Sequence, residues 1–337
     1  MMQKIKEKLL EQCQSLTKKE AYEIAMMMMD GKLTDSQIAS ILTALKIKGE
    51  TPEEIAGFVN ALKEKADVPE EINIDAIDTC GTGGDKKGTF NISTITAFVA
   101  AGANVKVAKH GNKAISSKSG SADILSELGV NINISNKKAI DAIKEIGIGF
   151  LFAPHFHKAM KNVANVRKEL GTKTIFNIIG PLANPLNVKR QIIGVYDKKL
   201  VYKLAEVFKF FNIEHVMLVY GTCGIDEFSI CSDTITIEIK NNEIIEKRYA
   251  PEDFGLTKYP LEAILGKDAK YNAKIAMDIL NGEKSPYRDI VVYNSGAAIY
   301  IAGKTNSIKE GINLANESID SGNALKKLQE LIHFTNN

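Results

Sequence analysis

The first 66 residues repeat one pattern, in which a polar start is followed by apolar residues at helical spacing. Ile38, Ile41, Leu42 and Leu45 illustrate this spacing, which places apolar side chains on one face of a helix. Each start fits a capping box, in which a Thr hydroxyl and a Glu or Gln side chain satisfy free backbone amides. The three boxes pair Thr17 with Glu20, Thr34 with Gln37 and Thr51 with Glu54. This region therefore predicts a small helical bundle, suited to scaffolding or dimerisation rather than catalysis.

Beyond about residue 70 the pattern changes to short apolar runs that alternate with helical segments. The strand-like runs are residues 74–78, 105–108, 149–153, 191–197 and 215–221, and the helical segments are 93–103, 121–128 and one ending near 211. Two β-rich runs around Asn241 and Asn242 predict an antiparallel hairpin, and the chain from about residue 261 reads as mostly helical. The predicted fold class is α/β, with a mainly parallel central sheet flanked by helices and a smaller all-α N-terminal lobe.

Composition and charge exclude several classes of protein. The 337 residues are 45% apolar and 25% charged, and 43 basic residues balance 41 acidic ones to a net charge of +2. This balance gives no reason to expect a nucleic-acid or membrane partner. The charged N-terminus does not resemble a signal peptide, and the four cysteines (Cys13, Cys80, Cys223 and Cys231) lack C-x-x-C spacing. We therefore expect a reduced, cytoplasmic protein without a zinc site.

The segment "DTCGTGGDKKGTFNIST" (residues 78–94) is the first candidate for chemistry. It follows a predicted strand and leads into a predicted helix, which is where ligands bind in open α/β sheets. Its glycines would let backbone amides approach an anion closely. The segment matches neither the Walker A nor the Rossmann pattern. Its composition is compatible with a phosphate loop of another kind or with a turn-rich connection.

The segment "KHGNKAISSKSGSAD" (residues 109–123) repeats the same placement after the next strand. It offers three lysines (Lys109, Lys113 and Lys118) together with several serine hydroxyls, which suit a polyphosphate or a sugar phosphate. Two such loops at successive strand ends of one sheet predict a shared phosphate site.

Two further features are ambiguous when taken alone. Asp226 and Glu227 follow the run at 215–221, and adjacent carboxylates there could hold Mg²⁺ or form an ordinary surface turn. Arg167 lies in a predicted, partly buried helix, where it could bind an anionic substrate or form an internal salt bridge. His155 and His157 have no third ligand nearby in sequence, which favours structural or substrate-channel roles over a metal site.

Four motifs in order along the chain resemble those of the anthranilate phosphoribosyltransferase family. They are "GTGGD" with "NIST", "KHGN-x-A-x-SS-x-SGSAD", "R-x-x-LG-x-x-T-x-FN-x-x-GPL-x-NP" and "G-x-DE". The resemblance covers nearly the whole chain. It implies the transfer of a phosphoribosyl group from 5-phosphoribosyl 1-diphosphate (PRPP) to the amine of anthranilate in tryptophan biosynthesis, with pyrophosphate as the second product. It also implies two Mg²⁺ ions per subunit and a homodimer formed through the helical lobe.

The same resemblance implies a role for each matching residue. The predicted PRPP-binding residues are Gly81, Gly84, Asp85, Thr89, Asn91, Ile92, Ser93, Thr94, Lys109, His110, Gly111, Asn112, Lys113, Ala114, Ile115, Ser116, Ser117 and Ser121. Gly81, Asn112 and Arg167 would bind anthranilate, and Ser93, Asp226 and Glu227 would bind the metal ions. No residue is assigned as a general acid or base. Lys113, Lys158 and Lys173 depart from the residues that are usual in the family.

The resemblance also sets the expected domains and the rival functions. We expect a helical lobe over residues 1–70, joined by helical segments from about 163–190, and an α/β domain over residues 71–337. A pyrimidine nucleoside phosphorylase would share this architecture, but the acidic pair and the "KHGN" loop favour the transferase. A nucleic-acid-binding relative should have a basic surface and a broken metal site, whereas here the net charge is +2 and the acidic pair is intact.

Overall fold

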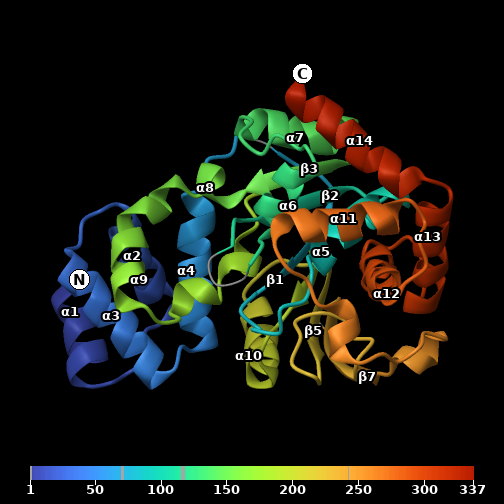
Figure 1. The fold of residues 1–337 in the computed structure, drawn as a ribbon. Helices are drawn as coiled ribbons and strands as arrows, with labels where there is room; N and C mark the ends of the chain where they lie inside the picture. The colour runs from blue at the N-terminus through green and yellow to red at the C-terminus, as the bar shows by residue number, and fades with distance from the viewer. Residues whose placement is uncertain (1, 70–71, 115–117, 242) are drawn as a thin grey trace.

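The computed structural model describes residues 2–69, 72–114, 118–241 and 243–337, and it places a helical lobe beside a larger α/β lobe (Figure 1). The three predicted capping boxes are all formed, at Thr17, Thr34 and Thr51. The first part of the helical lobe consists of α1 (Met2–Lys6), a π-helical turn (Glu7–Glu11), α2 (Lys18–Met29), α3 (Asp35–Lys48) and α4 (Pro52–Glu64). The three capping boxes start α2, α3 and α4.

The chain returns to this lobe after the third strand of the sheet. The returning elements are α8 (Ala153–Phe156), α9 (Lys161–Leu170) and 3₁₀ turns at Lys158–Met160, Ile175–Asn177 and Gly180–Ala183. Val163 and Val166 of α9 belong to the same buried cluster as Ile24 of α2 and Ile38 of α3. Figure 1 shows α9 lying among the helices of the first 64 residues. The helical lobe is therefore built from two stretches of sequence.

The α/β lobe is organised around one seven-stranded sheet in the order β3-β2-β1-β4-β5-β6-β7. The strands are β1 (Ile77–Gly81), β2 (Val107–Gly111), β3 (Ile148–Phe152), β4 (Arg190–Gly194), β5 (His215–Gly221), β6 (Thr234–Lys240) and β7 (Glu243–Tyr249). The five strands β1 to β5 are parallel, and β6 and β7 form the predicted antiparallel hairpin, in which Lys240 pairs with Glu243. The prediction of a mainly parallel sheet is confirmed.

Helices cover both faces of the sheet. Along β5, Met217 and Val219 enter one core, whereas Val216 and Leu218 enter the core shared with the helical lobe. This alternation with period two is what a sheet buried on both sides requires. The helices of the α/β lobe are α5 (Ile92–Gly102), α6 (Ser121–Glu127), α7 (Asn136–Glu145), α10 (Lys198–Phe208), α11 (Ala269–Leu280), α12 (Pro286–Ile301), α13 (Ile308–Asp320) and α14 (Asn323–Asn336), with 3₁₀ turns at Pro251–Phe254 and Leu261–Ile264.

The strands β1 and β2 lie about three residues later than the runs predicted at 74–78 and 105–108. Both strands extend beyond the apolar run into polar sequence, and those polar residues remain buried because they bind one another. The carboxylate of Asp78 accepts the His110 amide at 3.1 Å, and Lys109 Nζ donates to the Thr79 carbonyl at 2.5 Å. In the part of the chain that the structure describes, no helix combines the length and apolar character needed to cross a membrane.

Candidate active site at the carboxyl edge of the sheet

The strand order reverses its winding direction between β1 and β4. After β1 the chain winds towards β3, and from β4 it winds the opposite way towards β7, so β1 and β4 flank the point where the winding direction reverses. Ligands of open α/β sheets bind at such a point, beyond the carboxyl ends of the strands. Four parallel strands end there in a glycine: Gly111 of β2, Gly81 of β1, Gly194 of β4 and Gly221 of β5.

The loop after β5 packs directly onto the ends of β1 and β4. A Cβ atom on Gly194 would lie 1.7 Å from the Asp226 carbonyl oxygen, and one on Gly81 would lie 2.8 Å from Asp226 Oδ2. The same Oδ2 accepts a hydrogen bond from the Gly83 amide at 3.0 Å. These glycines therefore allow the acidic pair to reach the first glycine-rich loop.

Lys173 holds the other side of that loop. Its Nζ donates to the Gly84 carbonyl at 3.2 Å and lies 3.4 Å from the ring centre of Tyr196. Gly84 has a φ of +75°, which a residue with a side chain adopts only with strain. In the sequence, Lys173 stands out only as a departure from the family pattern, and nothing there indicates a contact with Gly84. Its contact with the loop depends on tertiary structure, because Gly84 and Lys173 are 89 residues apart.

The acidic side chains at this edge are poorly matched by donors. Asp85 Oδ2 is buried and has no hydrogen-bond partner among the described residues. Burial and then the charge of Asp85 raise the pKa of Asp226 to about 7. Burial and then the charge of Asp226 raise the pKa of Glu227 well above its ordinary value. Two adjacent carboxyl groups whose charged forms are disfavoured in this way make a site that a cation would stabilise.

The three predicted metal-binding residues lie in one place. The Ser93 amide, in the first turn of α5, donates to the Glu227 carboxylate. Lys109 is 4% exposed, and its Nζ lies 3.4 Å from Ser93 Oγ. Burial lowers the pKa of Lys109, although Asp78 acts in the opposite direction. The ammonium of Lys109 thus lies beneath the acidic pair, held by the end of β1.

This arrangement fits Mg²⁺. No group of three or more His, Cys, Asp or Glu side chains among the described residues is arranged to hold a metal ion by itself. Magnesium commonly takes one or two protein carboxylates and completes its shell with substrate phosphates and water. The buried, unpartnered oxygen of Asp85 and the oxygens of Asp226 and Glu227 supply donors of this type.

The second polar loop lies next to the first. Asn91 Nδ2, at the start of α5, donates to the Ser119 carbonyl at 3.1 Å. Ser121 Oγ donates to the Asn112 carbonyl at 3.2 Å, and the side chain of Asn112 is exposed. The Asp123 carboxylate accepts the Ala114 amide at 2.9 Å, which folds the loop back on itself. The predicted contacts at Ile115, Ser116 and Ser117 lie outside the described residues.

Some predicted PRPP-binding residues present only their backbone to this edge. The side chains of Ile92 and Thr94 are each 1% exposed, so they face the protein interior. The ring of His110 is buried, and its centre lies 5.2 Å from that of His157. His157 Nε2 lies 3.0 Å from the Ala183 carbonyl. These two histidines therefore pack β2 against the segment that returns to the helical lobe.

Arg167 lies in the last turn of α9, in the segment that returns to the helical lobe. Its guanidinium stands 5.3 Å from the ring centre of Phe176, and burial lowers its pKa. It forms no ion pair with any carboxylate in the described part of the chain. The alternative of an internal salt bridge is therefore not supported among those residues, and the positive charge remains available to a ligand.

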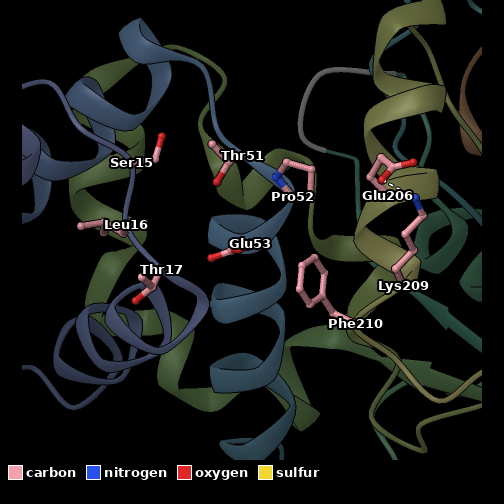
Figure 2. A pocket seen from close by; sticks show the side chains of 9 residues that line it. All are labelled: Ser15, Leu16, Thr17, Thr51, Pro52, Glu53, Glu206, Lys209 and Phe210. Atoms are coloured by element: carbon pink, nitrogen blue, oxygen red, sulfur yellow. Dashed lines mark hydrogen bonds and ion pairs between the residues drawn. The ribbon is translucent and has the colours of Figure 1, made fainter.

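A cavity of about 450 Å³ lies elsewhere, between the helical lobe and α10 (Figure 2). Glu53 and Glu206 line it, together with Phe210, and Lys209 is bound to Glu206 at 2.6 Å. Two carboxylates with one cation that is already paired make this cavity unsuitable for a polyphosphate. None of its lining residues belongs to the predicted site.

Comparison with known proteins assigns both lobes. Residues 73–325 match the family described as "Glycosyl transferase family, a/b domain", and residues 3–66 match "Glycosyl transferase family, helical bundle domain". Anthranilate phosphoribosyltransferase from Petrotoga mobilis is 50% identical over 96% of this chain and 94% of its own length. The enzyme from Acetivibrio thermocellus is also 50% identical, over 100% of this chain and 97% of its own length.

Solved structures agree with this assignment. Anthranilate phosphoribosyltransferase from Thermus thermophilus superposes with a TM-score of 0.92 at 39% identity, covering 99% of each chain. The enzyme from Saccharomyces cerevisiae in complex with PRPP and Mg gives a TM-score of 0.91 at 29% identity, covering 99% of this chain and 98% of its own. The chain therefore belongs to this glycosyl transferase family and, within it, to the anthranilate phosphoribosyltransferases.

Proposed function

We propose that this chain transfers the phosphoribosyl group of PRPP to the amine of anthranilate, giving N-(5-phosphoribosyl)anthranilate and pyrophosphate in tryptophan biosynthesis. The observation that supports this most directly is the meeting of two polar loops and an acidic cluster at the carboxyl edge of the sheet, where the winding reverses between β1 and β4. The yeast relative has been solved with PRPP and Mg and, separately, with 4-fluoroanthranilate. Those ligands correspond to the two substrates and the metal proposed here.

PRPP would bind across the two loops. The backbone of the first loop around Gly84 and the first turn of α5 would face the diphosphate, because free amides and a helix N-terminus favour anions. Lys109 and Lys113 would add positive charge from the second loop. The proposed binding residues are those of the sequence analysis, with Ile92 and Thr94 contributing through their backbone.

Magnesium use agrees with the relatives, and we propose two ions per subunit. Ser93, Asp226 and Glu227 would supply protein ligands, and Asp85 adds a buried oxygen beside Asp226. The ions would neutralise charge that develops on the departing diphosphate. The family motifs at these positions and the raised pKa values of Asp226 and Glu227 support this proposal.

The protein's own task in the reaction is orientation. We expect an oxocarbenium-like transition state at the anomeric carbon, by analogy with other glycosyl transfers. The amine of anthranilate is neutral at pH 7, so it needs positioning rather than removal of a proton beforehand, and we assign no general base. Gly81, Asn112 and Arg167 would hold anthranilate, with the guanidinium facing its carboxylate. Loop amides and Lys109 would stabilise the negative charge of the leaving group.

The proposed assembly uses the helical lobe as a dimer interface. Ile47 on α3 is 78% exposed and Leu10 is 39% exposed, which supports an apolar contact between two copies. We propose domains over residues 1–70 and 71–337, with about 163–190 added to the first, because that returning segment shares the helical core. We also propose a cytoplasmic location, as for a biosynthetic enzyme of small metabolites.

Fluorescence of anthranilate provides the test. We expect its emission to fall only when the protein, PRPP and Mg²⁺ are all present, and pyrophosphate to appear in equal amount. Reactions that lack one component serve as controls. Release of a free base from a pyrimidine nucleoside by inorganic phosphate, without any anthranilate turnover, would contradict the proposal and favour a nucleoside phosphorylase.

A further inference from the structure

Two cysteines meet at the neck of the loop between β5 and β6. The neck continues the ladder of these strands, because the Thr222 amide donates to the Asp233 carbonyl at 2.8 Å. One step further into the loop, the Cys223 amide donates to Ser232 Oγ at 2.9 Å. Cys231 lies near Cys223 because the Cys231 amide and the Cys223 sulfur both contact Ser229 Oγ, and both cysteine side chains are half-buried. The acidic pair of the candidate active site lies inside the loop that these cysteines bracket.

Polar groups converge on the sulfur of Cys223. Its Sγ lies 3.4 Å from the buried hydroxyl of Ser229, which also accepts the amides of Cys231 at 2.9 Å and Ser232 at 3.1 Å. Because Ser229 Oγ already accepts both amides, its own proton is free to point at the Cys223 sulfur, and a hydrogen bond to the sulfur favours the charged thiolate over the thiol.

The pKa values of the two thiols are shifted in opposite directions. Hydrogen bonding from Cys231 is the largest cause that lowers the pKa of Cys223, to about 5, with Ser229 and Ser232 assisting against the effect of burial. Donation to Cys223 and burial raise the pKa of Cys231. The contact with Ser229 thus marks Cys223 as the more acidic thiol of the pair and Cys231 as the thiol that keeps its proton.

We propose that Cys223 and Cys231 form a peroxide-sensitive thiol pair that closes reversibly into a disulfide across the neck of the active-site loop. The Cys223 thiolate attacks one oxygen of hydrogen peroxide, the O–O bond breaks, and the released hydroxide takes a proton to become water. The resulting sulfenic acid is attacked by the sulfur of Cys231, whose proton leaves with the hydroxyl group as a second water. Overall, two thiols are oxidised to one disulfide and one peroxide is reduced to two waters.

Alkylation of the wild-type chain tests the nucleophile without any mutation. Cys13 is the internal control because it is exposed, so accessibility alone predicts that it reacts faster than Cys223. At pH 6 an ordinary thiol is under about 1% thiolate, and an acidic thiol has a lower intrinsic nucleophilicity. Together these effects predict that iodoacetamide modifies Cys223 roughly fivefold to tenfold faster than Cys13. Faster modification of Cys13 would overturn the proposal.

Peroxide treatment of the full chain tests the disulfide. We expect a mass loss of about 2 Da, consistent with two thiols joining, a linked peptide pair containing Cys223 and Cys231, and full reversal by dithiothreitol. Cys13→Ser should behave like the wild type. Cys231→Ser should instead accumulate a sulfenic acid at Cys223 that dimedone traps. If Cys223 is recovered as a free thiol or as a sulfinic acid while Cys231 stays reduced, the pair does not act as proposed.

Discussion

The two ends of β5 each lie beside buried carboxylates, and the two sites treat their negative charge in opposite ways. Near the start of the strand, Glu238 of β6 accepts hydrogen bonds from His215 at 2.8 Å, Tyr300 at 2.6 Å and Lys247 at 3.1 Å. Burial alone would raise the pKa of Glu238, but these three donors lower it to about 2. Beyond the end of the strand, Asp226 has a pKa raised to about 7.

The contrast separates a structural carboxylate from a functional one. Glu238 has a donor for each oxygen, so its charge is stabilised by the folded protein itself. Asp226 lies beside Asp85, whose Oδ2 has no partner among the described residues. The negative charge of Asp226 is therefore not balanced by the protein, and a bound cation would stabilise it. Carboxylates near opposite ends of one strand thus serve stability at one end and, in the proposed function, binding at the other.

The largest effect is expected from neutralising the acidic pair. Asp226→Asn combined with Glu227→Gln should lower turnover roughly 100-fold to 1,000-fold, with only partial recovery at high Mg²⁺. The melting temperature should stay level or rise, because the change relieves repulsion between neighbouring carboxyl groups. Turnover is measured from anthranilate fluorescence and melting by calorimetry. Normal turnover at limiting Mg²⁺ would make the pair a surface turn.

The matched change at the other end of β5 should do the opposite. Glu238→Gln leaves the donors around it without a charged acceptor, and it should lower the free energy of unfolding by about 3 kcal/mol at pH 7. Because the folded pKa of Glu238 is about 2 and lies below its ordinary value of 4.5, its contribution is present above pH 4.5 and is lost as pH falls towards 2. Urea denaturation at pH 7 and pH 3 should show the difference from wild type shrinking. An unchanged difference at both values would contradict this account.

Arg167 extends the comparison to a cation without an internal partner. Arg167→Ala should weaken anthranilate binding about 10-fold to 150-fold, since a charge-assisted contact contributes roughly 1.5 to 3 kcal/mol. PRPP affinity and the melting temperature should change little, because no carboxylate is stranded among the described residues. Calorimetric titration of each substrate provides the measurement. Early melting with normal anthranilate binding would return Arg167 to a structural role.

The smallest effect concerns the buried histidines. Burial lowers the pKa of His110 to about 3 and that of His157 to about 4. Unfolding lets both take up protons below their ordinary pKa of about 6.5, so stability should fall as pH drops from 6.5 towards 4. Each histidine should contribute a slope of about 1.4 kcal/mol per pH unit. His157→Gln should flatten that slope by about one histidine's share, as measured by urea denaturation between pH 6.5 and 5.

The sequence predicts the scaffold better than it predicts the site. The capping boxes at Thr17, Thr34 and Thr51 and the hairpin β6–β7 were predictable because their signals are local. The first two strands were misplaced because Asp78 and Lys109 look like loop residues, and only contacts across the sheet keep them buried. The role of Lys173 was missed for the same reason, since its partner is far away in sequence.

The candidate site itself was recognised through long family motifs, whereas composition alone left its meaning open. Adjacent acidic residues such as Asp226 and Glu227 are common on surfaces, and nothing local distinguishes this pair. What distinguishes it is the raised pKa of both carboxyl groups, which burial and neighbouring carboxylates cause, and the strand order brings those neighbours together. Such a property belongs to the fold rather than to any one segment.

The division of the helical lobe between two stretches of sequence has a consequence for synthesis of the chain on the ribosome. The first four helices emerge early, but part of their core comes from Val163, Val166, Phe176 and Leu182. At roughly 5 to 20 residues per second, the ribosome needs on the order of ten seconds to make the segment that lies between. During that interval the early helices expose an apolar face. This apolar face of the first four helices is covered by its own chain only after α9 has been synthesised. Until then, contact with a chaperone or with strands that are already made would shield it from solvent.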